Sequence, residues 1–198
     1  MSILDARLKT APTDEPVTLD EAKEHLRVDH GDEDALIDSL IVAARKQAES
    51  EGWLSCCTQT WTLYLTGWPS APLLLPRHPV QSIVSLKYYD ADDVAQTVAT
   101  TVYTLTPAPG EDAQLWLKAA QEWPSAELSE RLYPVEVEYV TGYGNGVDVP
   151  ADIRQWLLLR IGSMYENRES VQVVPGVSNS ISLDFADSLL SDHRGFRY

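Results

Sequence analysis

The sequence predicts an α+β fold in which an α-helical core, of three main helices and a short C-terminal helix, carries an inserted, mostly antiparallel β-rich region. Apolar residues recur with the period of about 3.6 expected of an amphipathic helix before residue 55 and again after residue 148. Between these segments apolar and polar residues alternate, which is typical of half-buried strands. The chain has 198 residues, of which 44% are hydrophobic, so it can bury a core without metals or disulfides.

Changes in periodicity and composition divide the chain into five segments. We expect a flexible N-terminal arm (1–17), a helical pair (18–54), a β-rich insertion (55–147), the central helix of the helical core (148–168) and a C-terminal tail with a short helix (169–198).

The helical pair is the clearest local pattern in the sequence. Thr18 and Glu21 have the spacing of a capping box, in which each side chain satisfies a free backbone N–H of the other residue. The helix that starts there should stop by Gly31. Asp32 is expected to cap the second helix, for which Gly52 is the C-terminal stop.

The β-rich insertion is expected to contain several short strands. Trp61, Leu63 and Leu65 alternate with polar residues, which predicts the first strand. Further strands are expected at 83–89, 98–105, 115–117 and 135–140, joined mostly as a meander. The aspartates at 90, 92 and 93 are expected to form a turn after the second strand, and the glycines at 142, 144 and 146 a turn after the last one.

The central helix should begin at Pro150, because proline suits the first helical position. Its apolar residues cover more than one face, which indicates a helix that is either buried centrally or shared between subunits. The candidate subunit-interface residues are Trp156, Leu158, Leu159, Tyr165 and Arg168. A short helix is expected at 185–192 in the tail.

The charge of the chain argues against nucleic-acid binding. The net charge is -15, with 30 acidic and 15 basic residues, and no basic patch of the kind that grips phosphates is visible. Such acidity serves solubility, or provides a surface that DNA passes without sticking, and charge alone does not choose between these.

Motifs for catalysis, metal binding or cofactor binding are lacking, so we expect no catalytic residues, no cofactor and no metal. Cys56 and Cys57 are adjacent, and neighbouring side chains on a strand point to opposite faces, so we expect no disulfide between them. Two cysteines without a disulfide framework suit a reducing cytoplasm. The glycine-rich segment at 142–146 lacks the lysine of a phosphate loop. No apolar run of about 18 residues predicts a membrane span, and the N-terminus does not read as a signal peptide.

The order and spacing of several short segments resemble one family, the head–tail connector (adaptor, head-completion) proteins of long-tailed bacteriophages, prophages and gene transfer agents. The resemblance covers about residues 16–196. The segments that carry it are Pro16 to Asp29, Leu36 to Arg45, Gln59 to Trp61, Leu75 to Ser82, Trp123-Pro124, Val135 to Tyr139, Gly142 to Gly144, Val149 to Ile153 and Tyr165 to Glu169.

The resemblance implies a structural protein of the virion, assembled in the bacterial cytoplasm, rather than an enzyme. Such subunits form a ring of about a dozen copies beneath the portal protein. The ring extends the DNA channel and receives the next head-completion (stopper) or tail component. The C-terminal segment of the family contacts the portal, which corresponds here to about residues 175–198. The candidate portal-docking residues are Phe185, Leu189, Leu190, Arg194, Phe196 and Arg197.

Two other classes of function remain open from the sequence. An acidic binding module that mimics nucleic acid would explain the charge, although the acids are spread along the chain and form no dense stripe. A hydrolase with a carboxylate pair in the β-rich region would lack any motif of mechanistic spacing.

Overall fold

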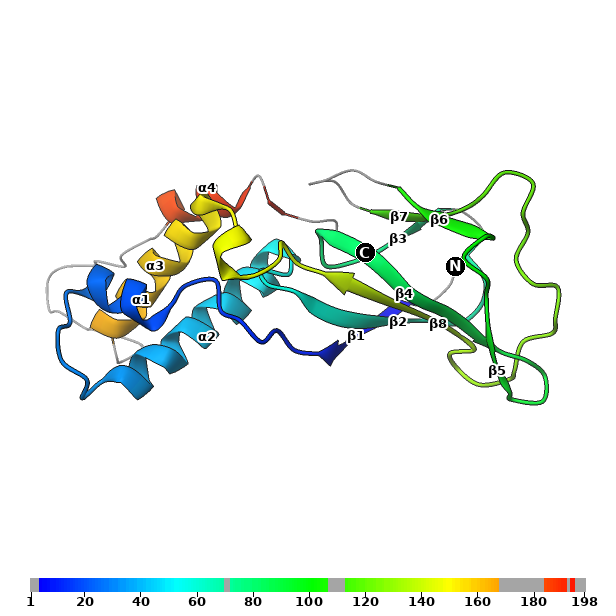
Figure 1. The fold of residues 1–198 in the computed structure, drawn as a ribbon, viewed down its shortest axis with the longest axis horizontal. Coiled ribbons are helices and arrows are strands. Elements are labelled where there is room, and N and C mark those ends of the chain that lie inside the picture. Colours follow the sequence, from blue (N-terminus) through cyan, green and yellow to red (C-terminus); the bar gives the residue numbers. More distant parts are fainter. Residues whose placement is uncertain (1–3, 70–71, 107–112, 168–183, 192, 195–198) are drawn as a thin grey trace, which may run out of the picture. The chain divides into compact units, whose positions relative to one another are not determined.

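The computed structural model describes residues 4–69, 72–106, 113–167, 184–191 and 193–194, and the predicted α+β class is confirmed (Figure 1). The chain forms two compact units. We call them the helical unit, built from Asp14–Cys57 and Tyr143–Arg194, and the sheet unit, built from Thr58–Gly142 together with the strand that precedes Asp14.

The helical unit contains α1 (Leu19–Leu26), α2 (Asp34–Gly52), α3 (Ala151–Glu166) and α4 (Asp184–Ser191), with a short 3-10 helix, η1 (Gly146–Asp148), before α3. The capping box predicted at Thr18 and Glu21 is present: the Glu21 backbone N–H donates to the Thr18 hydroxyl at 3.2 Å, and the Thr18 N–H donates to the Glu21 carboxylate at 2.9 Å. Helix α1 ends at Leu26, because Arg27 turns into the left-handed region with φ 59°.

The predicted cap of α2 is wrong. Glu33, not Asp32, is the N-cap residue, and its side chain makes no capping hydrogen bond. At the other end Gly52 is the last helical residue, and Trp53 takes the left-handed conformation with φ 52°. The helical pair is thus positioned mainly by its buried face, which includes Ile37, Ile41 and Ala44, and less by local capping.

The core of the helical unit is formed by residues of all four helices and the segments between them. Helix α3 packs against α1, α2 and α4. Its own buried side chains are Ile153, Trp156, Leu157 and Ile161, and Leu158 and Leu159 pack partly buried against the same core. The apolar residues on more than one face of α3 therefore have partners within the subunit, which favours the first of the two interpretations of that helix.

The sheet unit contains two antiparallel sheets. The larger one has the order β1-β2-β8-β4-β5, and its strands are β1 (Leu4–Thr10), β2 (Gln59–Leu65), β8 (Val135–Thr141), β4 (Val80–Tyr89) and β5 (Ala95–Thr97). The smaller one has the order β3-β7-β6, formed by β3 (Leu73–Leu74), β7 (Gln114–Leu117) and β6 (Tyr103–Leu105).

Two expectations for this region need correction. Residues 4–10 are not an arm without structure: they form β1, which pairs with β2 from Leu4 opposite Leu65 to Leu8 opposite Trp61. The sheet is also not a meander, since β2 lies between β1 and β8 and not beside β3. Both differences arise from pairings between strands that are distant in the sequence, which local periodicity does not encode.

Leu63, Leu86 and Val137 lie in the apolar core of the sheet unit, where each is almost completely buried. An aromatic stack packs against this core: the rings of Trp68 and Trp123 lie 5.1 Å apart and almost parallel, and the Trp123 indole N–H donates to the carbonyl of Pro69 at 3.0 Å.

The predicted turns are confirmed as well. The Asp90 carboxylate accepts the backbone N–H of Asp92 and Val94 between β4 and β5.

Candidate functional site

The C-terminal helix is anchored inside the helical unit. Leu190 of α4 is completely buried, and Leu189 packs partly buried against the same apolar cluster. These two candidate docking residues therefore hold α4 in place and offer little surface to a partner. Arg194, by contrast, is exposed. The side chain of Phe185, and the whole of Phe196 and Arg197, lie outside the described residues.

A hydrogen-bonded chain of three side chains fixes the position of His193, directly after α4. The Tyr143 hydroxyl lies 3.2 Å from His193 Nδ1, and His193 Nε2 lies 2.6 Å from Asp152 Oδ2. Burial raises the pKa of Tyr143 to about 12, so this phenol remains protonated at neutral pH. Burial opposes ionisation of Asp152, but the hydrogen bonds from His193 and from the Ile153 backbone N–H outweigh it and lower the pKa of this carboxyl.

These charge states define what the three side chains do. An ionised Asp152 accepts from His193 Nε2, and Nδ1 then accepts from the Tyr143 hydroxyl when the ring is neutral. The arrangement resembles a triad in outline, but its terminal hydroxyl is a phenol of raised pKa, a poor nucleophile. We call it the His193 latch: it joins the end of α4 to the start of α3 and to the segment after β8.

Among the candidate subunit-interface residues on α3, Trp156 is buried at 2% exposure and belongs to the core. Leu158, Leu159 and Tyr165 are partly buried against that core. The Tyr165 hydroxyl also donates a short hydrogen bond to the Glu33 carboxylate, next to the start of α2. Arg168 lies outside the described residues. The structure therefore leaves only the outer parts of these three side chains for contact with another subunit.

A buried ion network lies elsewhere in the helical unit, and sequence reasoning did not find it. Arg45 Nε donates to Glu15 Oε2 at 2.7 Å, and Arg45 Nη1 donates to Glu49 Oε2 at 3.0 Å. The other Glu49 oxygen accepts the Cys56 backbone N–H at 3.0 Å. Burial disfavours the charge on Arg45, but the hydrogen bond to Glu15 and the charge of Glu49 overcome this and raise the pKa of the guanidinium.

The ion network and the latch are linked through the backbone, because the Tyr143 N–H donates to the Cys56 carbonyl at 3.0 Å. Glu15, Cys56, Tyr143 and His193 each lie within two residues of a point where the chain enters or leaves the helical unit. The polar contacts thus tie together all four of these points. The only sequence signal was the spacing of Arg45 and Glu49, which matches an i,i+4 pair.

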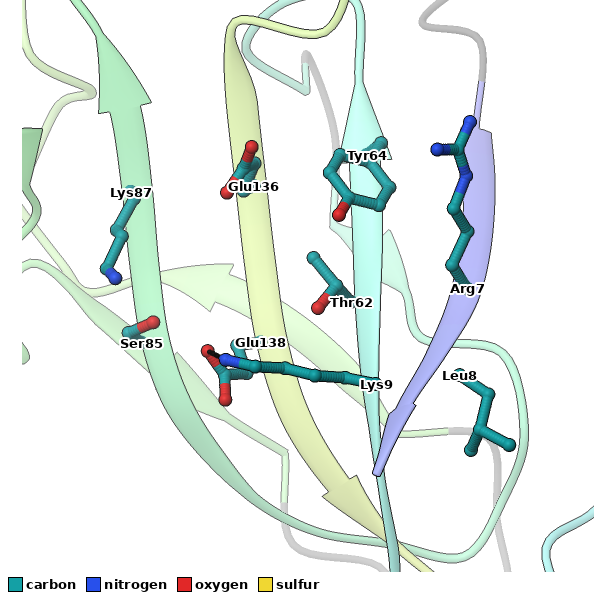
Figure 2. Close-up of a pocket in the computed structure, with 9 residues that line it drawn as sticks. All are labelled: Arg7, Leu8, Lys9, Thr62, Tyr64, Ser85, Lys87, Glu136 and Glu138. Atoms are coloured by element: carbon teal, nitrogen blue, oxygen red, sulfur yellow. Dashed lines mark ion pairs between the residues drawn. The ribbon is translucent and has the colours of Figure 1, made fainter. Parts of the chain in front are cut away.

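The larger sheet has a hollow of about 310 Å³ on one face (Figure 2). Side chains from four adjacent strands line it: Arg7, Leu8 and Lys9 from β1, Thr62 and Tyr64 from β2, Glu136 and Glu138 from β8, and Ser85 and Lys87 from β4. Lys9 reaches across β2 to form an ion pair with Glu138 at 2.7 Å, as Figure 2 shows. Arg7 pairs with Asp5 at 2.7 Å, and its guanidinium lies 5.1 Å from the centre of the Tyr64 ring.

The described residues offer no arrangement for redox or metal chemistry. Both cysteines are free and buried, and burial raises the pKa of the Cys57 thiol to about 12 and that of Cys56 well above its usual value. Neither is therefore a nucleophile at neutral pH. No group of three or more metal-ligating side chains occurs in the part of the chain that the structure describes, and no helix within that part is long and apolar enough to cross a bilayer.

Comparison with known proteins supports the predicted resemblance. Residues 16–90 match the family described as phage gp6-like head-tail connector protein, which is a family of structural connectors and not of enzymes. A search of curated proteins finds no match.

The fold is that of proteins in gene transfer agent particles. One similar chain comes from the "Virion of native gene transfer agent (GTA) particle", with 23% identity, a TM-score of 0.78, and coverage of 98% of this chain and 96% of that one. A second comes from the "Neck of empty GTA particle computed with C6 symmetry", with 22% identity, a TM-score of 0.78, and coverage of 98% of this chain and 97% of that one. A third comes from the "Neck of native GTA particle computed with C12 symmetry", with 23% identity, a TM-score of 0.75, and coverage of 98% of this chain and 97% of that one.

Proposed function

We propose that this chain is the subunit of a head–tail connector ring, which lies beneath the portal protein, extends the DNA channel and docks the next head-completion or tail component. The observation that carries the proposal is the similarity in fold, over 98% of the chain, to proteins of a particle neck that was computed with C12 symmetry. The match of residues 16–90 to the head-tail connector family supports it independently.

The charge of the chain fits such a position. A net charge of -15 on every subunit gives a ring a strongly acidic surface. Acidic side chains facing the channel repel DNA phosphates, so DNA passes through without specific binding. Of the two roles that the sequence allowed for this acidity, solubility and a surface that DNA passes without sticking, the second suits the wall of a DNA channel.

The portal-docking segment of the proposed ring begins at the His193 latch. Leu190 and His193 fix the end of α4 on the helical unit. The exposed Arg194 follows directly, and Phe196 and Arg197 complete the candidate set. A latched starting point limits the conformations of the residues after it, which lowers the entropy lost when they bind a portal.

Light scattering of the purified protein, alone and mixed with its cognate portal, tests the proposal. We expect a complex with the mass of a ring, formed alone or on the portal as template. A protein that stays monomeric and ignores the portal would overturn the proposal and favour the acidic binding module.

Two deletions locate the docking segment. Removing residues 175–198 also removes Leu190 and His193 from the core of the helical unit, so a loss of portal binding by this variant could come from unfolding. Removing only residues 195–198 keeps α4 and the latch. We expect the shorter deletion to retain the melting temperature and the helical circular dichroism signal, and to lose the portal complex.

A further inference from the structure

Strand β1 forms an open edge of the larger sheet. It pairs with β2 on one side, and among the described residues no strand pairs with its other side. The pairing is regular over five residues, from Leu4 to Leu8, with an irregularity only before Thr10. Residues 7–10 are exposed, and Leu8 keeps 45% of its surface accessible. Such an edge is a template for another extended chain.

The opposite edge of the same sheet is different. Strand β5 is short and covers β4 only from Lys87 to Tyr89. The remaining part of β4 has two irregularities, between Val80 and Ser82 and between Ile83 and Ser85. Bulges of this kind interrupt the ladder and discourage pairing with a further strand. Of the two edges, therefore, only β1 carries a regular and uninterrupted run.

The basic residues of β1 do not protect its edge in the usual way. Charged side chains that point outward from an edge strand hinder pairing. Lys9 instead lies across the sheet face toward Glu138 (Figure 2). Arg7 lies against the Tyr64 ring and forms an ion pair with Asp5. Both charges are drawn over the face, which leaves the backbone of β1 accessible.

The charge beside this edge suits a second copy of the chain. The hollow next to β1 is lined by three basic residues (Arg7, Lys9 and Lys87) and two acidic ones, whereas the whole chain has twice as many acids as bases. Lys87 forms no ion pair with any other residue that the structure describes. Two copies that each carry a charge of -15 repel each other, and that repulsion is reduced where one copy presents basic side chains.

We propose that the β1 edge and the adjoining hollow bind an extended, acidic segment of a second copy of this chain, so that the five-stranded sheet continues from one subunit into the next. The inference rests on the proposed ring. The contact is heterologous, because the β1 edge meets a different surface of the neighbour, and repeated contacts of this kind close a ring.

Site-specific cross-linking tests the identity of the neighbour. The natural thiols, Cys56 and Cys57, are completely buried, so Leu8→Cys introduces the accessible thiol to which a benzophenone maleimide is attached. Trp116→Cys is a matched control, because Trp116 has a similar exposure of 42% on the smaller sheet. After assembly with the portal and illumination, we expect the probe at position 8 to give a dimer whose cross-linked peptide belongs to this chain and is acidic. The probe at position 116 should give much less.

Three results would overturn the inference. If rings form but the probe at position 8 reacts only with the portal, or gives no more dimer than the probe at position 116, β1 is not a subunit contact and the connector function stands. If no ring or portal complex forms at all, the proposed function and the inference fail together.

A charge reversal gives a second, independent measurement. Arg7 has an exposed side chain, and exposed ion pairs such as that with Asp5 contribute little to stability, so Arg7→Glu should lower the melting temperature of the monomer only slightly. It should raise the concentration needed for half-maximal assembly by about tenfold or more, because it places a like charge opposite the acidic segment. Unchanged assembly would contradict the proposed charge pairing.

Discussion

The helical unit and the sheet unit are stabilised by different kinds of interior. The two charged residues that the described chain buries, Arg45 and Glu49, both lie in the helical unit, where hydrogen bonds join them to Glu15 and to the backbone of Cys56. The buried polar residues of the sheet unit, such as Gln59 and Thr141, lie in or at the ends of strands whose backbone ladder already satisfies most polar groups.

The difference follows from how each unit is assembled. In the sheet unit the ladder fixes the register of each strand, and alternating apolar residues then fill the core. The helices of the helical unit have no backbone ladder between them, and helix packing alone allows small shifts of one helix against another. Specific polar contacts such as the Arg45 network therefore select one arrangement. The two units should accordingly respond differently to substitutions of similar size.

Removing the central charge of the network should have the largest effect. Arg45→Leu leaves Glu15 and Glu49 close together without a cation, which should lower the free energy of unfolding by about 3–5 kcal/mol. Urea denaturation followed by far-ultraviolet circular dichroism measures this change in the free energy of unfolding. Adding Glu15→Gln and Glu49→Gln to this variant should restore part of the loss, because the unpaired charges are then gone.

Arg131→Leu serves as the control for a surface cation. Arg131 lies over the Tyr89 ring and is 3.7 Å from Asp93, and its side chain is 38% exposed. Its replacement should cost less than about 1 kcal/mol. An equally small loss for Arg45→Leu would show that the helical unit does not depend on its ion network.

A cavity in the sheet core tests the apolar side of the comparison. Leu63 is completely buried on β2, between Ala6 of β1 and Val137 of β8. Leu63→Ala should cost about 2–5 kcal/mol, through lost burial and the cavity left behind. The exposed Val84→Ala should change stability by only about 0.5 kcal/mol or less. A loss for Leu63→Ala no greater than that of Val84→Ala would mean that this core is loosely packed.

A close backbone approach offers a third test. A Cβ atom on Gly146 would lie 2.2 Å from the carbonyl oxygen of Glu15, whereas one on Gly67 would meet no atom within 4 Å. Gly146→Ala must displace the segment that places Glu15 beside Arg45, and we expect a loss of about 1–3 kcal/mol. Gly67→Ala should be nearly neutral, and urea denaturation followed by circular dichroism measures both variants. Equal effects would show that the Glu15 segment moves freely.

The sequence predicted those elements whose pattern is local and strong. The helices containing Ile37 and Trp156 have a clear periodic apolar stripe, and the strand at Leu63 has strict alternation. Strand β1 was not predicted, although Leu4, Ala6 and Leu8 alternate with charged residues. Its partner, β2, begins about fifty residues later, and one short alternating run does not show which strand it pairs with. The order of the strands in the larger sheet was not predicted, because β2 and β8 pair across about seventy intervening residues.

The candidate surfaces were less predictable than the fold. Leu190 was expected at a portal contact because the family resemblance implies that the C-terminal segment docks there, yet Leu190 is buried within its own subunit. An apolar residue has the same pattern in sequence whether it faces its own core or a partner. His193 was not predicted to have a structural role, because its partners, Tyr143 and Asp152, are 50 and 41 residues away.

The smallest effect is expected from the His193 latch, whose contribution to the stability of the helical unit depends on pH. The folded protein lowers the pKa of Asp152, so the latch stabilises the helical unit above the ordinary aspartate pKa of 3.8. That contribution disappears as the pH falls from this value through the lower pKa of the folded state. Because the Asp152 side chain is 40% exposed, solvent screening limits the contribution to about 1 kcal/mol or less.

Asp152→Asn should therefore reduce the free energy of unfolding slightly at pH 7 and hardly at all once the pH is below the lowered, folded-state pKa of Asp152, so that the two stability curves converge on acidification. Glu166→Gln, at the last residue of α3, is the matched control at the other end of the same helix. Hydrogen exchange should also rise in α4 of the Asp152 variant, because α4 loses the contact that secures its end. Curves that stay parallel at all pH values would mean that Asp152 acts through packing, and not through its charge on His193.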